Sequence, residues 1–262
     1  MDGYLRFRQV CLAAPDLEAA AGDIGAIFGL EVCHRDPGVG RFGLANVLFA
    51  AGTSFIEVVA PLREGTAAGR FLDRSGGRGG YMAIFDSSDP DACMAHAASI
   101  GVRTVYEIDR PGDYRCVQFH PRDCRAAMLD VERTYGGESL TGPWHPAGPA
   151  WQEHLDTRTT RGIVAIEAVS PRPADLAAHW GSILQRPVDR AGDRLTIGVD
   201  EGPQVRIAAN ARDDRELLDA VVIDVADPAR VMAEADRRGR ASGPGAIDLY
   251  GVTFRLAPEE AG

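Results

Sequence analysis

The segment 119–123, Phe-His-Pro-Arg-Asp, brings together side chains that can act on a small molecule. His120 titrates near physiological pH and can serve as a general acid or base. Arg122 can hold a carboxylate or phosphate group through paired hydrogen bonds. Alternatively, Arg122 and Asp123 only form an ion pair across a turn that Pro121 stiffens. The residues alone leave both interpretations open.

The other histidines and the cysteines give weaker signals. His34 lies on a short predicted strand, His96 and His179 within predicted helices, and His145 and His154 in a loop region. We interpret these five as structural or solvent-exposed. The five cysteines are scattered and contain no C-x-x-C pair, so we expect reduced, small apolar side chains instead of a zinc or redox site.

The composition is that of an ordinary globular protein. The 262 residues carry a net charge of −10, and all 28 basic residues are arginine. An acidic surface repels phosphate backbones and anionic membranes, so we expect neither nucleic acid nor membrane among the partners. No run of about 18 apolar residues is present for a membrane-spanning helix, and the first residues lack the features of a signal peptide. We therefore predict a cytoplasmic protein.

Four similar stretches follow one another along the chain. Each starts with an apolar, strand-like run that ends at an aspartate before a predicted helix. Asp16, Asp89, Asp175 and Asp227 are expected to cap these helices, because a carboxylate accepts hydrogen bonds from the free amides of the first turn. Three further strand-like runs follow the first helix and three follow the second. Each of these two units therefore reads as strand, helix and three strands.

We divide the chain into two domains of paired units. Residues 1–135 form the first domain, 136–160 a linker rich in glycine and proline, and 161–262 the second domain. In the fourth unit only two strand-like runs, 246–249 and 252–256, follow the helix. This shortening predicts that the second domain is degenerate.

Two segments resemble one known superfamily. The run 9–17, Gln-Val-Cys-Leu-Ala-Ala-Pro-Asp-Leu, and the run 55–59, Phe-Ile-Glu-Val-Val, are similar to the vicinal oxygen chelate superfamily of glyoxalases, extradiol dioxygenases, methylmalonyl-CoA epimerases and bleomycin-resistance proteins. The resemblance covers residues 4–135 well and 160–258 weakly. It implies an α+β fold in which tandem paired βαβββ modules form curved mixed sheets around a cavity.

The resemblance also implies a site. The superfamily takes its metal ligands from the first and fourth strands of each unit, which correspond here to Gln9, Glu57, Tyr81 and Asp130. Gln9, Glu57 and Asp130 would hold a divalent ion such as zinc, nickel, manganese or iron, which acts as a Lewis acid. Tyr81 departs from the histidine of glyoxalases and dioxygenases, so a non-haem iron oxygenase is not expected. Alternatively, the four residues line a metal-free ligand cavity, as in antibiotic-sequestering members.

The second domain has different residues at the matching places. Asp219 aligns with Tyr81, Arg206 with Glu57, and Arg255 with Asp130. Two arginines cannot bind a cation. They either neutralise Asp219 inside a vestigial cavity or receive an anionic ligand.

Three functions follow as hypotheses. The first is an isomerase, epimerase or lyase that moves a proton next to a carbonyl, with Glu57 or His120 as base, Gln9 and Asp130 positioning metal or substrate, and Arg122 holding a carboxylate. The second is a protein that sequesters a small molecule, with Tyr81 as a stacking face. The third is a scaffold for oligomerisation. A small-molecule ligand is expected in the first two, and a homodimer is compatible with all three.

Overall fold

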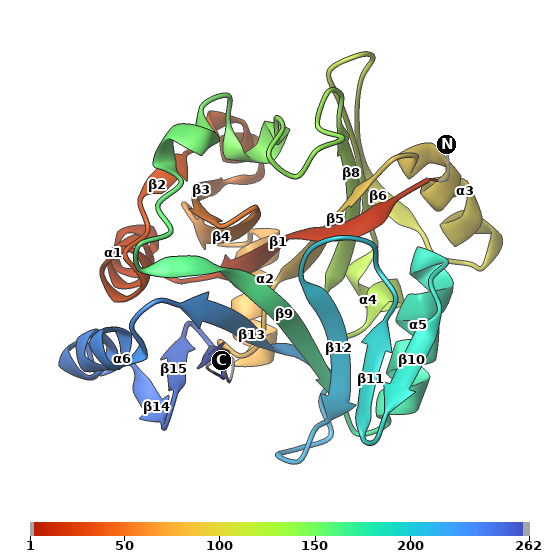
Figure 1. Ribbon diagram of the computed structural model, residues 1–262. Helices are drawn as coiled ribbons and strands as arrows, with labels where there is room; N and C mark the ends of the chain where they lie inside the picture. Colours follow the sequence, from red (N-terminus) through yellow and green to blue (C-terminus); the bar gives the residue numbers. More distant parts are fainter. Residues whose placement is uncertain (1–2, 259–262) are drawn as a thin grey trace.

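The computed structural model describes residues 3–258, which form two similar halves (Figure 1). The first half contains one eight-stranded sheet in the order β2-β3-β4-β1-β5-β8-β7-β6. β1 runs parallel to β4 and antiparallel to β5, and β5 runs parallel to β8. The two units are therefore joined edge to edge through β1 and β5. Their strands are β1 (Leu5–Ala13), β2 (Val32–His34), β3 (Leu44–Ala51), β4 (Ser54–Pro61), β5 (Met82–Ser87), β6 (Thr104–Arg110), β7 (Tyr114–Phe119) and β8 (Met128–Thr134).

The second half repeats this layout in the order β10-β11-β12-β9-β13-β16-β15-β14. Its fourth unit has all its strands, because Ala241–Gly243 forms the short β14 that the sequence analysis did not predict. The expected loss of a strand was therefore wrong. The strands are β9 (Thr160–Ser170), β10 (Val188–Ala191), β11 (Arg194–Ile197), β12 (Gln204–Ala209), β13 (Leu217–Val225), β14, β15 (Ala246–Leu249) and β16 (Val252–Leu256).

Four helices follow the first strands of the four units. They are α1 (Leu17–Phe28), α3 (Pro90–Ser99), α5 (Pro173–Leu184) and α6 (Pro228–Arg237), with α2 (Ala67–Ser75) and α4 (Pro121–Cys124) as additions. Asp16, Asp89 and Asp227 cap their helices as predicted. Asp175 does not, because α5 begins at Pro173 and Asp175 lies inside its first turn. None of the helices in residues 3–258 is long and apolar enough to cross a bilayer.

The two halves share one hydrophobic core. It lies between the sheets and their helices and includes Val10 and Phe28 from the first half with Trp180 and Phe254 from the second. The rings of Phe28 and Phe254 lie 5.2 Å apart. The chain therefore buries the helix-facing sides of both sheets in a common interior.

The opposite side of the first sheet, which we call its inner face, carries Gln9, Glu57 and Asp130. The sheet curves around this face, since Phe42, which lies between β2 and β3, and Tyr106 on the edge strand β6 bring their rings to 5.2 Å. Residues 136–155, which we call the strap, include η2 (His145–Ala147) and η3 (Trp151–His154) and pack over the inner face beside β2 and β3 (Figure 1). Trp144 and Trp151 of the strap are fully buried there. Most of the predicted linker is thus part of the first half.

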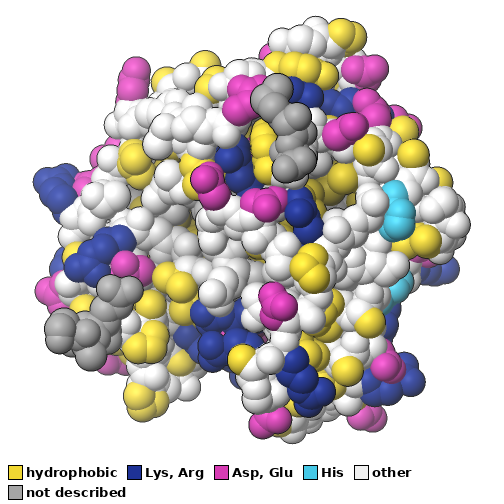
Figure 2. Space-filling view, turned by 45° about the vertical axis from the view of Figure 1, so that its right-hand side comes forward, with side chains coloured by type: hydrophobic (Ala, Val, Ile, Leu, Met, Phe, Trp, Pro, Cys, Tyr) yellow, Lys and Arg dark blue, Asp and Glu magenta, His cyan; other side chains and the backbone are white. Residues whose placement is uncertain are grey.

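Charged side chains of both signs are spread over the face of the molecule that Figure 2 shows. In this view, arginine side chains gather below the centre of the visible face, at the height that the second half occupies in Figure 1.

Candidate functional site

Strand register shows which residues of the two units are equivalent. Across the antiparallel β1–β5 pair, Gln9 lies opposite Ile84 and Cys11 opposite Met82. A two-fold relation between the units therefore places Met82, and not Tyr81, at the position equivalent to Gln9. Tyr81 directly precedes that position in the sequence. Tyr81 still packs beside the inner face, with its ring 5.1 Å from that of Phe71 in α2, and burial raises its pKa to about 12.

The same register relates Glu57 to Asp130. Glu57 on β4 lies beside Cys11, and Asp130 on β8 lies beside Ile84, the residue equivalent to Cys11. Each unit thus projects one carboxylate from its fourth strand onto the inner face. Both side chains are buried.

Glu57 is held by two amide groups. The Gln9 Nε2 group donates to Glu57 Oε2 at 2.9 Å, and the Asn46 Nδ2 group donates to Oε1 at 2.7 Å. The Trp144 indole donates to Gln9 Oε1 at 3.0 Å, which connects the strap to this chain of bonds. Burial raises the pKa of Glu57, and the bonds from Asn46 and Gln9 oppose that rise. Amide donors of this kind stabilise the ionised carboxylate.

Asp130 lies in a different setting, beside a second buried acid. Ligand atoms of Asp130, Glu132 and Cys116 lie within 4.8 Å of one another, and the Cys116 thiol is 3.5 Å from Asp130 Oδ1. Asp130 Oδ2 and Glu132 Oε2 are buried without a hydrogen-bond partner. Burial raises the pKa of Asp130 to about 8, and burial together with the neighbouring Asp130 raises that of Glu132 well above its usual range. These surroundings therefore favour the protonated form of Asp130.

The donor atoms favour one part of the inner face for a divalent ion. The unpartnered oxygens of Asp130 and Glu132 are free to coordinate a cation, and Cys116 offers a third ligand. Gln9 Oε1 and both oxygens of Glu57 already accept hydrogen bonds. Of the expected ligands Gln9, Glu57 and Asp130, the geometry thus favours Asp130, joined by Glu132 and Cys116.

His120 and Arg122 are not brought to these carboxylates. The His120 side chain caps α4 by accepting from the Arg122 backbone N–H at 3.1 Å. Asp123 pairs with Arg103 at 2.7 Å, and not with Arg122 as the structural alternative assumed. The same turn packs on α5, where the Trp180 indole donates to the Cys124 carbonyl at 2.8 Å. The segment 120–124 therefore joins the two halves.

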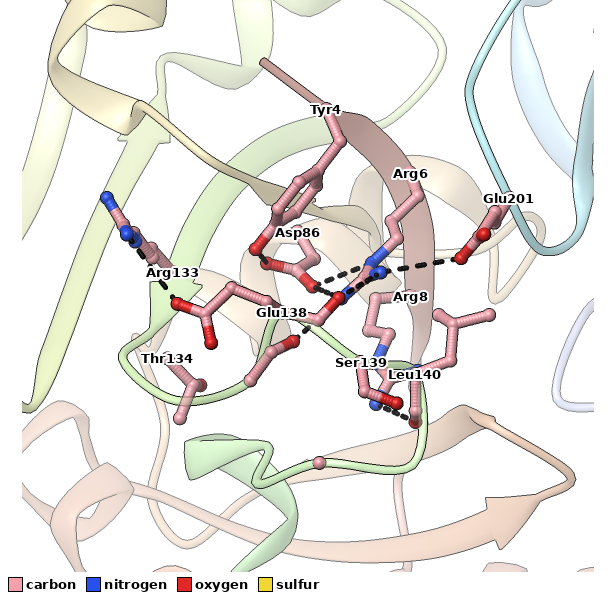
Figure 3. Close-up of polar contacts among 12 residues, drawn as sticks. Tyr4, Arg6, Arg8, Asp86, Arg133, Thr134, Glu138, Ser139, Leu140 and Glu201 are labelled. Carbon is pink, nitrogen blue, oxygen red and sulfur yellow. Dashed lines mark hydrogen bonds and ion pairs between the residues drawn. The ribbon is translucent and has the colours of Figure 1, made fainter. Parts of the chain in front are cut away.

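The strap is fastened to β1 by two buried arginines (Figure 3). Arg6 forms a buried ion pair with Asp86 and donates to the carbonyls of Gly137 and Glu138 at 2.7 and 3.0 Å. Arg8 donates to the Leu140 carbonyl at 2.6 Å, and its guanidinium lies 5.5 Å from the Trp144 ring. Burial lowers the pKa of Arg8 to about 10. These contacts hold the strap over the inner face.

His145 is a strap residue whose contact with the sheet sequence reasoning missed. Its ring stacks on Tyr114 of β7 at 4.0 Å, and its Nε2 lies 3.0 Å from Arg110 Nη1. Asn46, Cys116, Glu132 and Trp144 were also missed. Glu132 could have been found, because it lies two residues after Asp130 on the same strand and therefore on the same face.

The second half places charged residues at the corresponding positions of its sheet. Arg206 lies beside Glu167 on β9, and Arg255 beside Val222 on β13, which matches the places of Glu57 and Asp130. Arg255 contacts both Glu167 and, at 3.5 Å, Asp219. Asp219 is thus contacted by Arg255 and Arg212, whereas Arg206 contacts Glu167, an acid that the sequence analysis did not single out.

Comparisons with known proteins give the following similarities. Human (Homo sapiens) mitochondrial methylmalonyl-CoA epimerase is 24% identical over 130 residues, which cover 49% of this chain and 73% of that protein. A hypothetical protein from Staphylococcus aureus superposes with a TM-score of 0.67 at 13% identity, covering 97% of this chain and 99% of the other. The Mn(II)-bound glyoxalase from Novosphingobium aromaticivorans gives a TM-score of 0.62 at 14% identity, covering 96% of this chain and 81% of the other. No protein-family model matches the chain.

Proposed function

Because the chain has the tandem glyoxalase-like fold of the vicinal oxygen chelate superfamily, we propose that its first half moves a proton next to a carbonyl group of a small molecule, as an epimerase or isomerase does. The observation that carries this proposal is the pair of buried carboxyl groups, Glu57 and Asp130, at equivalent positions of the two units. The similarity to an epimerase supports the same class of reaction.

The two carboxyl groups suit opposite roles. Glu57 accepts hydrogen bonds from Gln9 and Asn46, which favour its ionised form, so it is the base that removes the proton. Asp130, whose pKa burial raises to about 8, keeps a proton near neutral pH and is the acid that returns one or protonates the carbonyl oxygen. A difference in ionisation between two neighbouring carboxyl groups is what acid–base catalysis needs.

A divalent ion would change the role of Asp130, because a carboxylate that binds a metal is ionised and cannot also donate the proton. Asp130, Glu132 and Cys116 would hold the ion, because their ligand atoms lie close together and two of their oxygens have no other partner. A bound ion would act as a Lewis acid that polarises the substrate carbonyl. Gln9 would orient Glu57, and the strap would exclude water from the inner face.

A deuterium-exchange assay tests the proposal. Methylmalonyl-CoA and simpler 2-substituted acyl thioesters are incubated with the protein in D2O, and loss of the proton next to the carbonyl is followed by NMR. Exchange should occur with the unaltered protein and fall strongly in Glu57→Gln and in Asp130→Asn. Metal content, measured in parallel by elemental analysis, should fall in Asp130→Asn and stay unchanged in Glu57→Gln.

Binding of these compounds without proton exchange would favour a sequestering function. If these compounds raise the melting temperature but no proton exchanges, the first half is a sequestering protein and the proposed reaction is wrong.

A further inference from the structure

The inner face of the second sheet contains a cavity with arginines at its wall. Its volume is about 410 Å³, and it is lined by Glu167, Ala191, Asp193, Arg194, Arg206, Ile207 and Ala208. Within residues 3–258, no segment like 136–155 covers this face. Arg206 lies at the position equivalent to Glu57, so the same place in the fold carries the opposite charge in the second half.

The acidic side chains around the cavity do not fully neutralise its arginines. Glu167 contacts Arg255 closely, while Arg206 reaches Glu167 only at 3.7 Å. Arg206 also donates through Nε to Gln204 at 2.9 Å. Arg194 forms no ion pair within residues 3–258. Burial lowers the pKa of Arg206, and the neighbouring positive charge of Arg194 lowers it further.

We propose that this cavity binds a small organic anion whose carboxylate or phosphate group lies between Arg194 and Arg206. A guanidinium group matches either oxyanion through paired hydrogen bonds. The Ala191 and Ala208 side chains provide apolar wall for the organic part of such a ligand. The anion relieves the repulsion between two neighbouring guanidinium groups. This positive site is local, because the protein as a whole has a net charge of −10.

The acidic residues of the wall set the strength of binding. Glu167 competes with the ligand for Arg206, because its carboxylate is already within reach of that side chain. Asp193 is exposed beside Arg194 at the tip of the β10–β11 hairpin and opposes an anion at longer range. Removing the charge of Glu167 should therefore strengthen binding, an effect opposite to that of removing Arg206.

Isothermal titration with phenyl phosphate and with benzoate tests the site and separates the two oxyanions. Arg206→Gln and Arg194→Gln should each weaken binding of the preferred probe at least about tenfold, the loss expected for a charge-assisted hydrogen bond. Glu167→Gln should tighten it. Arg190→Gln is the matched control, because Arg190 is exposed on the same hairpin but lies opposite Leu195, whose side chain faces the core. It removes the same charge from the other side of the hairpin.

Two results would overturn the proposal. Equal weakening by Arg190→Gln and Arg206→Gln would mean that the probes respond only to overall charge. Absence of binding to the unaltered protein with either probe, at concentrations where the folded state is verified by circular dichroism, would mean that the cavity has no oxyanion site. Because this cavity lies on the second sheet, neither result bears on Glu57 and Asp130.

Discussion

Glu57 and Asp130 show how equivalent backbone positions acquire different surroundings. Both side chains point to the inner face from the fourth strand of a unit. Glu57 has two amide donors, whereas Asp130 has a thiol and a second buried acid beside it. In the proposed reaction, the side chains around each carboxyl group, and not its place in the fold, decide whether it acts as the acid or the base.

Replacement of Glu57 by Gln tests the base. The substitution removes the proton acceptor and should slow deuterium exchange at least about 100-fold, within the range that general-base catalysis supplies. The new amide N–H2 group faces either Gln9 or Asn46, so one buried donor loses its acceptor at a cost of about 1–3 kcal/mol in the free energy of unfolding. NMR exchange and urea unfolding measure the two effects. Glu64→Gln, on the exposed surface, is the control and should change neither; full activity in Glu57→Gln would assign the base elsewhere.

The raised pKa of Asp130 predicts how stability depends on pH. Its pKa is about 8 in the folded protein and near the ordinary 3.8 when unfolded, so folding favours the protonated form. This contribution is fully present below about pH 4, is lost as pH rises to about 8, and is constant above that value. Asp130→Asn cannot ionise and should be more stable than the unaltered protein at pH 9 by more than about 2 kcal/mol, with a smaller difference at pH 5.

Urea unfolding at pH 5, 7 and 9 measures this dependence. The exposed Asp109→Asn serves as the control and should follow the unaltered protein at each pH. If Asp130→Asn changes the free energy of unfolding by the same amount at all three pH values, Asp130 is ionised throughout this range and cannot be the acid.

At the scale of elements, the strap shows where composition misleads. Its glycines and prolines are typical of a linker, but Trp144 and Trp151 need buried surroundings and find them on the first sheet. The strand–helix repeats were predictable, because apolar runs and capping aspartates are local signals. Trp144 donates a hydrogen bond to Gln9, which is far away in the sequence, and no local sequence pattern predicts such a contact. Most of the residues around Glu57 and Asp130 were missed for the same reason.

The bond between Trp144 and Gln9 should control how often the strap opens. Trp144→Phe removes the indole donor and leaves Gln9 Oε1 unpaired in a buried site, so backbone amides of the strap should exchange with D2O at least about tenfold faster. Trp151→Phe is the matched variant, because its lost bond goes to Gly142 within the strap itself. Hydrogen-exchange mass spectrometry compares them. Equal acceleration in the two variants would mean that bulk packing, and not the bond to the sheet, holds the strap.

At the scale of the whole molecule, the short strand β14 and the core shared by the two halves could not be predicted from the sequence. A three-residue strand at a sheet edge has too few side chains to show a pattern, and its pairing with β15 decides that it is a strand. The joining of the halves was also not predictable. Asp23 of α1 accepts hydrogen bonds from Arg238, Arg240 and Tyr250 of the second half, and each of these residues looks like ordinary surface in the sequence.

The shared core predicts that the two halves unfold as one. Asp23→Asn weakens charge-assisted hydrogen bonds at the junction of the halves and should lower the free energy of unfolding by about 2 kcal/mol. Asp224→Asn is the control. It removes the exposed ion pair with Arg161 and should lower the free energy of unfolding by less than about 1 kcal/mol. Circular dichroism and hydrogen exchange in each half should give coincident urea transitions in all three proteins, because neither sheet can keep its helix-facing side buried alone. A separate, earlier transition of the second half would show instead that the core divides into two independent units.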